Sequence, residues 1–192
     1  MFWTKRYGSL SDALANPRKV KILELHRTGL DCDINRVGEL RHVHEVRIGW
    51  LDIEDLPSGI LNMPNLKKLT VLNSPIKELP CWIGKLKKLK TLVVRGTDIK
   101  ELPSSLSKLN GLSTLNVGNN PLISSLPTNI GDLSKLRTLN LHCTSVGELP
   151  ESLENLKRLR LLQLTGTKFS GDQRLALQFK LQAKISPYLE VT

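Results

Sequence analysis

The sequence repeats itself at a nearly constant interval, and this feature constrains its fold more than any other. Apolar segments of similar pattern begin 23 residues apart, with a single interval of 24. They begin at Val20, Val43, Leu66, Leu89, Leu112, Leu136 and Leu159. A fixed period of about 20 to 29 residues is typical of stacked-repeat proteins, in which each repeat is one structural unit. We therefore expect seven stacked units that share one continuous core.

The first half of each unit predicts a short strand. The pattern L-x-x-L-x-L-x-x-N/T-x-L occurs, for example, in LKTLVVRGTDI, which begins at Leu89. Within it Leu92 and Val94 alternate with Val93 and Arg95, so the two pairs of side chains point to opposite faces of the strand. One face is expected to enter the core and the other to face outward.

The second half of each unit predicts a turn followed by a short helical or irregular return segment. A Leu-Pro step recurs there, as in KELPCWIGKLKK and KELPSSLSKLNG. Pro80, Pro103, Pro127 and Pro150 fix the backbone φ angle and cannot donate a hydrogen bond to a sheet.

One such unit cannot bury its own apolar face, so neighbouring units must stack, with their strands forming a parallel sheet on the concave side of an arc. Seven apolar columns then run through the stack, and each buried aliphatic side chain contributes roughly 1.5–3 kcal/mol. In one repeat the columns are represented by Leu89, Leu92, Val94, Ile99, Leu102, Leu106 and Leu109. The leucines are thus assigned to the core.

These motifs resemble the leucine-rich-repeat family, in particular its 23-residue class with a Leu-Pro step, over about nine-tenths of the chain. Members of this class occur among short bacterial repeat proteins and plant intracellular Ras-group repeat proteins, and similar repeats occur in plant immune receptors. The resemblance implies an α/β leucine-rich-repeat solenoid with a curved, parallel concave sheet, and it implies a binding role.

Two positions depart from the family pattern. Position nine, where the family often has Asn, holds Thr28, Leu51, Ser74, Thr97, Asn120, Thr144 and Thr167. Thr and Ser hydroxyls can still bond backbone groups, whereas Leu51 cannot, so the second repeat is expected to be locally irregular. The first repeat has Asp33 and Ile34 where a Leu-Pro step is expected, which is typical of a terminal unit.

Both ends of the repeat array are expected to carry helical caps. Residues 1–19 form the predicted N-terminal cap, with Ser9 and Asp12 in a capping-box-like arrangement and Pro17 as a stop. Residues 20–171 form the seven repeats. Residues 172–192 form the C-terminal cap, with an amphipathic helix from about Asp172 to Ile185. Two caps favour a whole domain, and a slice of a longer receptor is the alternative.

Composition and localisation signals are consistent with a soluble chain. No apolar stretch is long enough to form a signal peptide or a membrane-spanning helix. This favours a cytoplasmic protein unless an export signal precedes the sequence given. The three cysteines, Cys32, Cys81 and Cys143, leave an odd thiol and fall in different repeats and columns, so we expect free thiols.

No catalytic, cofactor-binding or metal-binding site is predicted. His42 and His44 lie close in the sequence, but no Cys, Asp or Glu cluster completes a tetrahedral set of ligands. No G-x-S-x-G, P-loop or G-x-G-x-x-G motif is present. These observations predict a protein that is not an enzyme.

Basic residues recur at the point where each predicted strand begins, and they contribute to a net charge of +10. Stacking would align them in a basic ridge formed by Lys67, Lys68, Lys87, Lys88, Lys90, Arg137, Lys157, Arg158 and Arg160. Such a ridge serves either as solubilising charge or as a site for an anionic ligand. Without interleaved aromatics or a groove-reading helix, it disfavours specific nucleic-acid recognition.

The outward positions of the strands are the candidate partner-binding residues, because their side chains are not needed in the hydrophobic core. They are Glu24, His26, Arg27, Arg47, Trp50, Lys68, Thr70, Leu72, Val93, Arg95, Asn116, Asn140 and His142. Trp50 is the most informative, since Trp and Arg are enriched among interface hot spots. The alternative is that Trp50 packs locally against Leu51.

The sequence therefore predicts a binding scaffold that recognises a protein partner through its concave face. An electrostatic anchor that holds an anionic surface or polymer through the basic ridge is the alternative. The two differ in salt dependence, because ionic strength weakens the anchor much more than it weakens a hot-spot interface.

Overall fold

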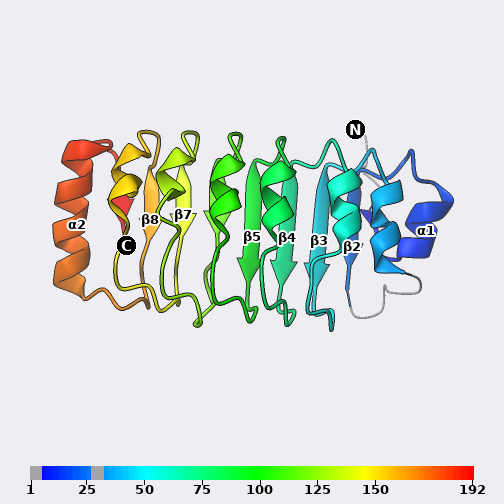
Figure 1. The fold of residues 1–192 in the computed structure, drawn as a ribbon, viewed down its shortest axis with the longest axis horizontal. Coiled ribbons are helices and arrows are strands. Elements are labelled where there is room, and N and C mark those ends of the chain that lie inside the picture. Colours follow the sequence, from blue (N-terminus) through cyan, green and yellow to red (C-terminus); the bar gives the residue numbers. More distant parts are fainter. Residues whose placement is uncertain (1–5, 27–32) are drawn as a thin grey trace.

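The chain folds into one sheet of nine parallel strands that follow one another in sequence order (Figure 1). This is a computed structural model, and it describes residues 6–26 and 33–192. The strands are β1 (Arg6–Tyr7), β2 (Ile22–Leu25), β3 (Glu45–Gly49), β4 (Lys68–Leu72), β5 (Thr91–Arg95), β6 (Thr114–Asn116), β7 (Thr138–Asn140), β8 (Leu161–Gln163) and β9 (Glu190–Val191).

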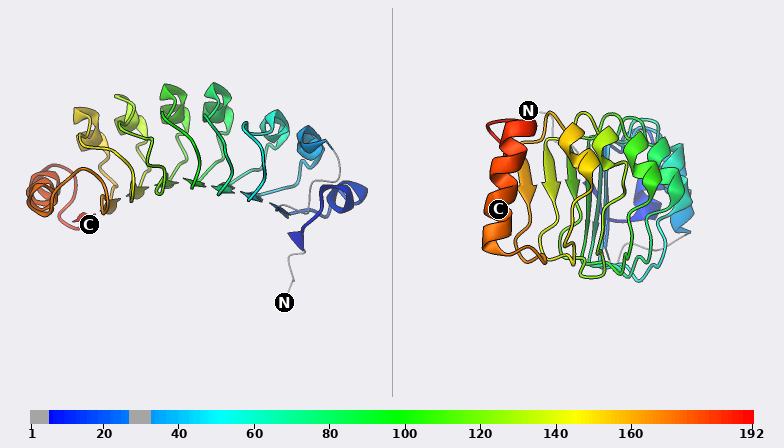
Figure 2. Two further views of the ribbon diagram at one scale, coloured as in Figure 1. Left: turned by 90° about the horizontal axis from the view of Figure 1, so that it is seen from below. Right: turned by 60° about the vertical axis from the view of Figure 1, so that its left-hand side comes forward.

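The molecule is curved: the strands line its concave side, and short helical turns lie on its convex side (Figure 2). The turns are 3-10 helices η1 (Ile34–Glu39), η2 (Ser58–Asn62), η3 (Cys81–Lys85), η4 (Ser104–Lys108), η5 (Ile130–Asp132) and η6 (Glu151–Asn155). A 3-10 turn occupies few residues, so the return path on the convex side stays compact. The predicted leucine-rich-repeat solenoid is confirmed.

The strand register follows the sequence repeat. Leu69 of β4 pairs with Leu92 of β5, which pairs with Leu115 of β6, and Leu115 pairs with Leu139 across the one longer repeat. All four are fully buried. Because each unit presents the same apolar positions to the same neighbours, the predicted core columns are confirmed as one continuous aliphatic core.

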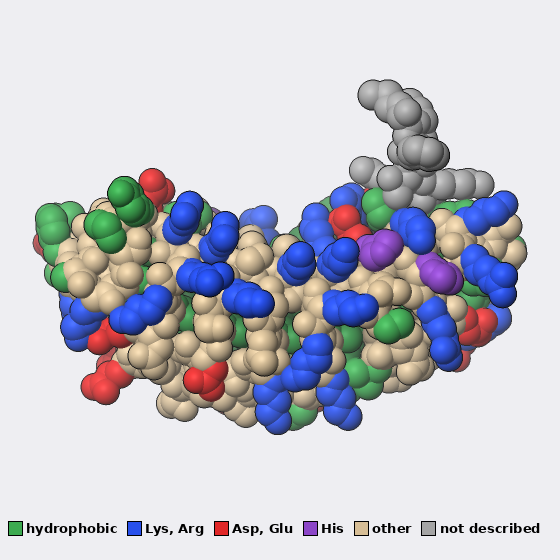
Figure 3. Space-filling model, turned by 90° about the horizontal axis from the view of Figure 1, so that it is seen from above, with side chains coloured by type: hydrophobic (Ala, Val, Ile, Leu, Met, Phe, Trp, Pro, Cys, Tyr) green, Lys and Arg blue, Asp and Glu red, His purple; other side chains and the backbone are tan. Residues whose placement is uncertain are grey.

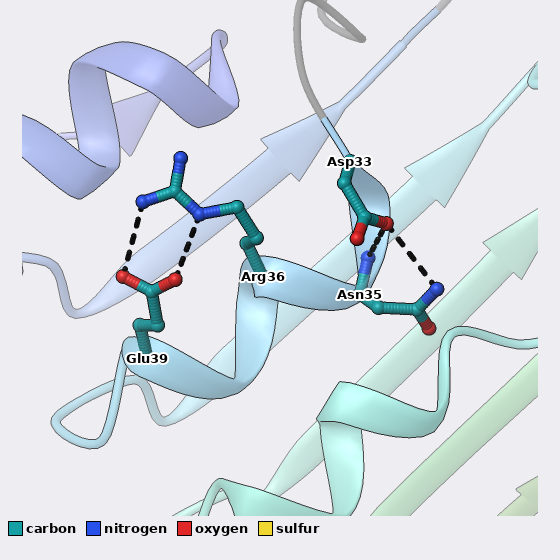
Figure 4. Close-up of polar contacts among 4 residues, drawn as sticks. All are labelled: Asp33, Asn35, Arg36 and Glu39. Atoms are coloured by element: carbon teal, nitrogen blue, oxygen red, sulfur yellow. Dashed lines mark hydrogen bonds and ion pairs between the residues drawn. The ribbon is translucent and has the colours of Figure 1, made fainter.

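Proline precedes most of the 3-10 turns, as the Leu-Pro step predicted. Pro57, Pro80, Pro103 and Pro150 each occupy the cap position before η2, η3, η4 and η6. In the first repeat Asp33 takes this place, and its carboxylate accepts a hydrogen bond from the Asn35 backbone N–H at 2.9 Å. Arg36 and Glu39 pair across the same turn at 2.8 Å (Figure 4). A side-chain cap therefore replaces proline in this terminal unit.

Position nine ties neighbouring units together through polar side chains. Asn120 is fully buried, and its Oδ1 accepts hydrogen bonds from both the N–H and the hydroxyl of Thr97, each at 2.8 Å. Its Nδ2 donates to the carbonyls of Val94 and Val117 at 2.8 and 2.9 Å. The Thr144 hydroxyl likewise donates to the Leu141 carbonyl at 2.8 Å. The expectation that Thr hydroxyls bond backbone groups here is confirmed.

The irregularity expected at Leu51 is absent. Leu51 is buried, and its backbone N–H donates to the Ser74 hydroxyl of the next repeat at 3.2 Å. Trp50 before it has the same backbone conformation and the same inter-repeat hydrogen bond as Asn73 in the next unit. The Ser74 hydroxyl accepts from Leu51 just as the Asn120 side chain accepts from the Thr97 N–H, so the backbone at Leu51 keeps the geometry of the repeat, and the prediction was wrong.

Helices lie at the two ends of the sheet. Helix α1 (Leu10–Ala15) begins at Ser9, whose hydroxyl accepts from the Asp12 N–H. Helix α2 (Gly171–Lys184) begins with a reciprocal capping box between Ser170 and Gln173. Each end also adds a strand that was not predicted, because β1 pairs with β2 and β9 pairs with β8. In the described ranges, no helix is both long and apolar enough to cross a bilayer.

Candidate functional site

The concave face is built from the outward side chains of the strands, arranged in rows by the sheet register. Arg47, Thr70 and Val93 are paired neighbours on β3, β4 and β5, and Leu72 pairs with Arg95 in an adjacent row. Parallel strands lie about 4.8 Å apart, so these side chains form one patch. Arg27, also predicted to bind a partner, lies outside the described residues.

An ion-pair network crosses the N-terminal part of this face. Arg47 Nη1 contacts Glu24 Oε1, while Arg47 Nε lies 2.6 Å from Glu45 Oε1. Lys68 Nζ lies 3.0 Å from the same Glu45 oxygen. Burial alone would raise the pKa of Glu45, but its hydrogen bonds with Arg47 and Lys68 outweigh burial and lower that pKa. Arg47 and Lys68 were predicted as contact residues, and both are already compensated by carboxylates.

Thr70 is hidden by its neighbours. It is only 9% exposed, although its side chain is on the concave side of β4. Its hydroxyl has no hydrogen-bond partner among the residues that the structure describes. Its neighbours in the row, Arg47 and Val93, are larger, so Thr70 offers a partner far less surface than we expected.

A row of left-handed residues follows the strands, one in each of repeats two to seven. These residues are Trp50 (φ 52°), Asn73 (48°), Gly96 (63°), Asn119 (58°), Cys143 (52°) and Gly166 (73°). The Trp50 N–H donates to the Leu72 carbonyl, and the Asn73 N–H donates to the Arg95 carbonyl. Asn and Gly tolerate this conformation, whereas a residue such as Trp is strained in it by about 1–2 kcal/mol. A repeated Asn or Gly at this position was the sequence signal for the row.

Trp50 is half exposed and lies against His26. The Trp50 side chain keeps 50% of its surface exposed, and its ring centroid is 6.0 Å from that of His26 with the planes tilted by 39°. Gly49 leaves room for this pair, because a Cβ atom there would lie 3.1 Å from His26 Nδ1. The ring that Trp50 meets belongs to His26, on the surface, while Leu51 is buried in the core.

Leu72 and Arg95 extend this surface into the next two repeats. Both side chains are half-buried, and they are direct register partners. The Arg95 guanidinium makes no ion pair within residues 6–26 and 33–192. Its charge is therefore uncompensated, unlike that of Arg47. We call Trp50, His26, Leu72 and Arg95 the tryptophan patch.

The C-terminal half of the concave face is polar and largely hydrogen-bonded to itself. The Asn116 side-chain oxygen accepts from the Gly118 N–H at 3.0 Å, and that of Asn140 accepts from the His142 N–H at 2.9 Å. Asn140 Nδ2 donates to Gln163 Oε1. We expected adaptable hydrogen bonding from this strip, but much of its capacity is used internally.

His142 and the cysteines form no larger cluster. His142 Nε2 lies 3.2 Å from Cys143 Sγ, and its Nδ1 is buried without a described partner. Cys81 and Cys143 are free and exposed, while Cys32 falls in the undescribed range. In the described part of the chain, no group of three or more His, Cys, Asp or Glu residues is placed to hold a metal ion.

Comparisons with known proteins identify the repeats. Residues 60–123 match a family model described as a leucine-rich repeat region, and residues 135–156 match one described as a leucine rich repeat. A comparison with curated proteins found no match.

Solved structures with a similar fold include three from different organisms. A leucine-rich-repeat protein of Leptospira interrogans is 23% identical, with a TM-score of 0.72 over 98% of this chain and 53% of its own. An internalin of Listeria monocytogenes is 22% identical, with a TM-score of 0.76 over 97% of this chain and 51% of its own.

The third is the leucine-rich-repeat ectodomain of a plant membrane receptor kinase from Arabidopsis thaliana, solved in complex with Casparian strip integrity factor 2. It is 21% identical, with a TM-score of 0.56 over 84% of this chain and 23% of its own. The present chain thus spans about half the length of the two bacterial proteins and a smaller part of the plant one.

Proposed function

The chain is a leucine-rich-repeat protein, and we propose that it is a non-catalytic scaffold that binds a protein partner through the tryptophan patch on its concave face. The rigid parallel sheet supports this proposal, because a preformed surface loses little conformational entropy when a partner docks. A similar ectodomain was solved in complex with a named factor, which fits a binding role for this kind of fold.

The observation that carries the proposal is the strained and exposed Trp50. Neighbouring repeats place Asn73 and Gly96 at the equivalent position, where the left-handed backbone is easily adopted. Trp50 adopts the same left-handed conformation, which is less favourable for Trp, and it leaves half of its surface in solvent. Strain that burial offsets only in part indicates a role outside the folded chain itself. A large aromatic surface beside an Arg is the composition expected at the centre of an interface.

The neighbours of Trp50 define the kind of surface that a partner would meet. Leu72 adds apolar area, and Arg95 adds a positive charge that no described carboxylate compensates. The network of Glu24, Arg47 and Glu45 lies beside them and holds the Arg47 side chain in one position. We therefore expect a partner that presents an apolar group for Trp50 and a carboxylate or backbone carbonyl for Arg95.

The test compares proteins captured from the native lysate by three forms of the chain. The forms are wild type, Trp50→Asn, and the convex control Lys85→Ala. Trp50→Asn keeps a residue that the left-handed position accepts, so lost binding cannot be ascribed to a damaged backbone. We expect one protein to be retained by wild type and Lys85→Ala and lost by Trp50→Asn. With that protein purified, Trp50→Ala and Arg95→Ala should each weaken affinity by about thirtyfold, equivalent to 2 kcal/mol.

The alternative, an electrostatic anchor, predicts the opposite pattern. If affinity is unchanged by Trp50→Ala and Arg95→Ala but collapses when Lys87, Lys88 and Lys90 are neutralised, the concave-face proposal is wrong. A steep loss of affinity with added salt would accompany that result.

A further inference from the structure

The edge of the sheet at which the strands begin is strongly basic. Seven short segments lead into the strands there, at residues 16–21, 40–44, 63–67, 86–90, 109–113, 133–137 and 156–160. They contain no Asp or Glu. Their basic residues are Arg18, Lys19, Lys21, Arg41, Lys67, Lys87, Lys88, Lys90, Lys135, Arg137, Lys157, Arg158 and Arg160. Figure 3 shows this edge, where Lys and Arg side chains gather together with histidine and acidic side chains are sparse.

Several acidic residues lie instead on the loops that leave the strands. Glu54, Asp55, Glu78, Asp98 and Glu101 all fall between the end of a strand and the next 3-10 turn. Solubilising charge normally mixes both signs over a surface. Here the segments that enter the strands carry basic charges alone, whereas the loops that leave the strands mix acids with Lys77 and Lys100. The basic edge therefore carries a positive field of its own.

The pKa of His44 is affected by these basic neighbours. Burial lowers the pKa of His44, and the positive charges of Lys21, Lys67, His42 and Lys88 lower it further. No anionic group contributes to this shift in the described surroundings of His44.

The basic edge is divided into two unequal parts. Segment 109–113 carries no charge and separates them. In the N-terminal part, Lys87 Nζ donates to the Lys108 carbonyl and Lys88 Nζ donates to Asn65 Oδ1, at 3.1 and 2.9 Å. The C-terminal part holds Arg137, Arg158 and Arg160. These guanidinium groups make no hydrogen bond or ion pair with any residue that the structure describes.

The three arginines line one hollow of about 240 Å³, together with Lys157, Ser186 and Tyr188. We call it the guanidinium hollow. The Arg160 N–H donates to the Arg137 carbonyl at 2.8 Å, so these two side chains start from adjacent turns of the solenoid. Lys157 Nζ donates to the Lys184 carbonyl at 2.7 Å, which connects the hollow to the end of α2. Tyr188, 80% exposed, stands at its side with the Ser186 hydroxyl.

We propose that the guanidinium hollow binds a phosphate group of a small ligand or of a lipid headgroup. Three guanidinium forks match phosphate oxygens, which accept paired N–H donors and carry more charge than one carboxylate. The Ser186 hydroxyl can donate to the same group, and the Tyr188 ring can cover one side of the ligand. Glu190 lies near Arg160 in the adjoining hollow, so the bound anion sits toward Arg137 and Arg158.

The test is a calorimetric titration with inorganic pyrophosphate at low ionic strength. We expect saturable 1:1 binding by the wild-type chain and at least a tenfold loss of affinity for the double variant Arg137→Gln, Arg158→Gln. The matched control is Arg18→Gln, Lys19→Gln, which removes the same charge from the other part of the edge and should change affinity less than twofold. All four side chains are exposed, and thermal unfolding checks that both variants fold.

Either of two results would overturn the proposal. If the control variant loses as much affinity as the arginine variant, the attraction is diffuse and no site exists. Absence of saturable binding by wild type would count against it equally. Neither result bears on the tryptophan patch, which lies on a different surface.

Two further arms identify the source of the phosphate. Phosphatidylcholine vesicles that contain phosphatidylinositol 4,5-bisphosphate are compared with phosphatidylserine vesicles of equal total charge. Preferential binding to the phosphoinositide, lost in the arginine variant, supports the hollow and assigns a lipid headgroup. Binding of pyrophosphate without binding to either vesicle supports it and assigns a soluble ligand. Equal binding to both vesicles, unaffected by the arginine variant, contradicts it.

Discussion

The indole ring of Trp50 lies 6.0 Å from the imidazole ring of His26, centroid to centroid, above a glycine that leaves space for both. The pair is surface packing, because half of Trp50 remains in contact with solvent. The left-handed backbone at Trp50 costs free energy that this partial contact offsets only in part.

Trp50→Asn should therefore leave the free energy of unfolding unchanged or slightly higher. Asn is the residue that the chain has at the equivalent positions 73 and 119, so the substitution relieves strain of about 1 kcal/mol while it loses the contact with His26. Urea unfolding followed by circular dichroism measures the difference. A loss above about 1 kcal/mol, within the common range for point mutations, would show that Trp50 is retained for folding.

Leu115→Ala should destabilise the chain by about 2–5 kcal/mol, through lost burial and the cavity left behind. Leu115 is fully buried in the interior strand β6, between its register partners Leu92 and Leu139. Thr114→Ala, at the adjacent half-buried position, is the matched control and should cost far less. A change below about 1 kcal/mol for Leu115→Ala would contradict the column assignment.

Asn120→Ala should cost at least about 3 kcal/mol, although Asn is not an apolar core residue. Its removal leaves the Thr97 N–H and two backbone carbonyls buried without partners, at about 1–3 kcal/mol for each unsatisfied group. Thr144→Val is a milder comparison, because it removes a single hydroxyl donor. Equal urea midpoints for Asn120→Ala and wild type would mean that water replaces all of these hydrogen bonds.

The fold was largely predictable from the sequence because a repeat has only one way to bury its apolar face. The spacing of Leu92, Val94 and Ile99 placed them correctly in the core. Strands β1 and β9 were missed, since two residues are too few to show an alternating pattern. They form because an open sheet edge leaves unpaired backbone groups that a neighbouring segment can satisfy.

The candidate site was less predictable, because exposure and pairing depend on neighbouring repeats. Outward alternation placed Thr70 and Arg47 on the concave face, but it could not show that Thr70 is covered or that Arg47 is paired with Glu24 and Glu45. Those facts depend on the side chains one repeat away. The shared left-handed position of Trp50 and Asn73 was readable in principle, since Asn and Gly recur at the same place in the repeat.

Stability should fall as the pH is lowered through the range in which His44 titrates. Burial and the cations Lys21, Lys67, His42 and Lys88 hold the pKa of His44 in the folded chain below its usual value. The unfolded chain, with a histidine pKa of about 6.5, therefore takes up this proton first as the pH falls. The contribution of neutral His44 to the free energy of unfolding is complete above the pKa of the unfolded chain. It is lost as the pH falls from that value to the lower pKa of the folded chain.

His44→Gln should weaken this pH dependence, because glutamine does not titrate. Urea midpoints measured for both proteins just above and just below the ordinary histidine pKa give the comparison, and the other three histidines are common to both. Lys67→Gln is a second variant: it removes one of the cations near His44, so the folded pKa should rise toward its usual value and the slope should decrease. If wild type and His44→Gln lose the same stability over this interval, the basic edge does not act on His44 as its surroundings indicate.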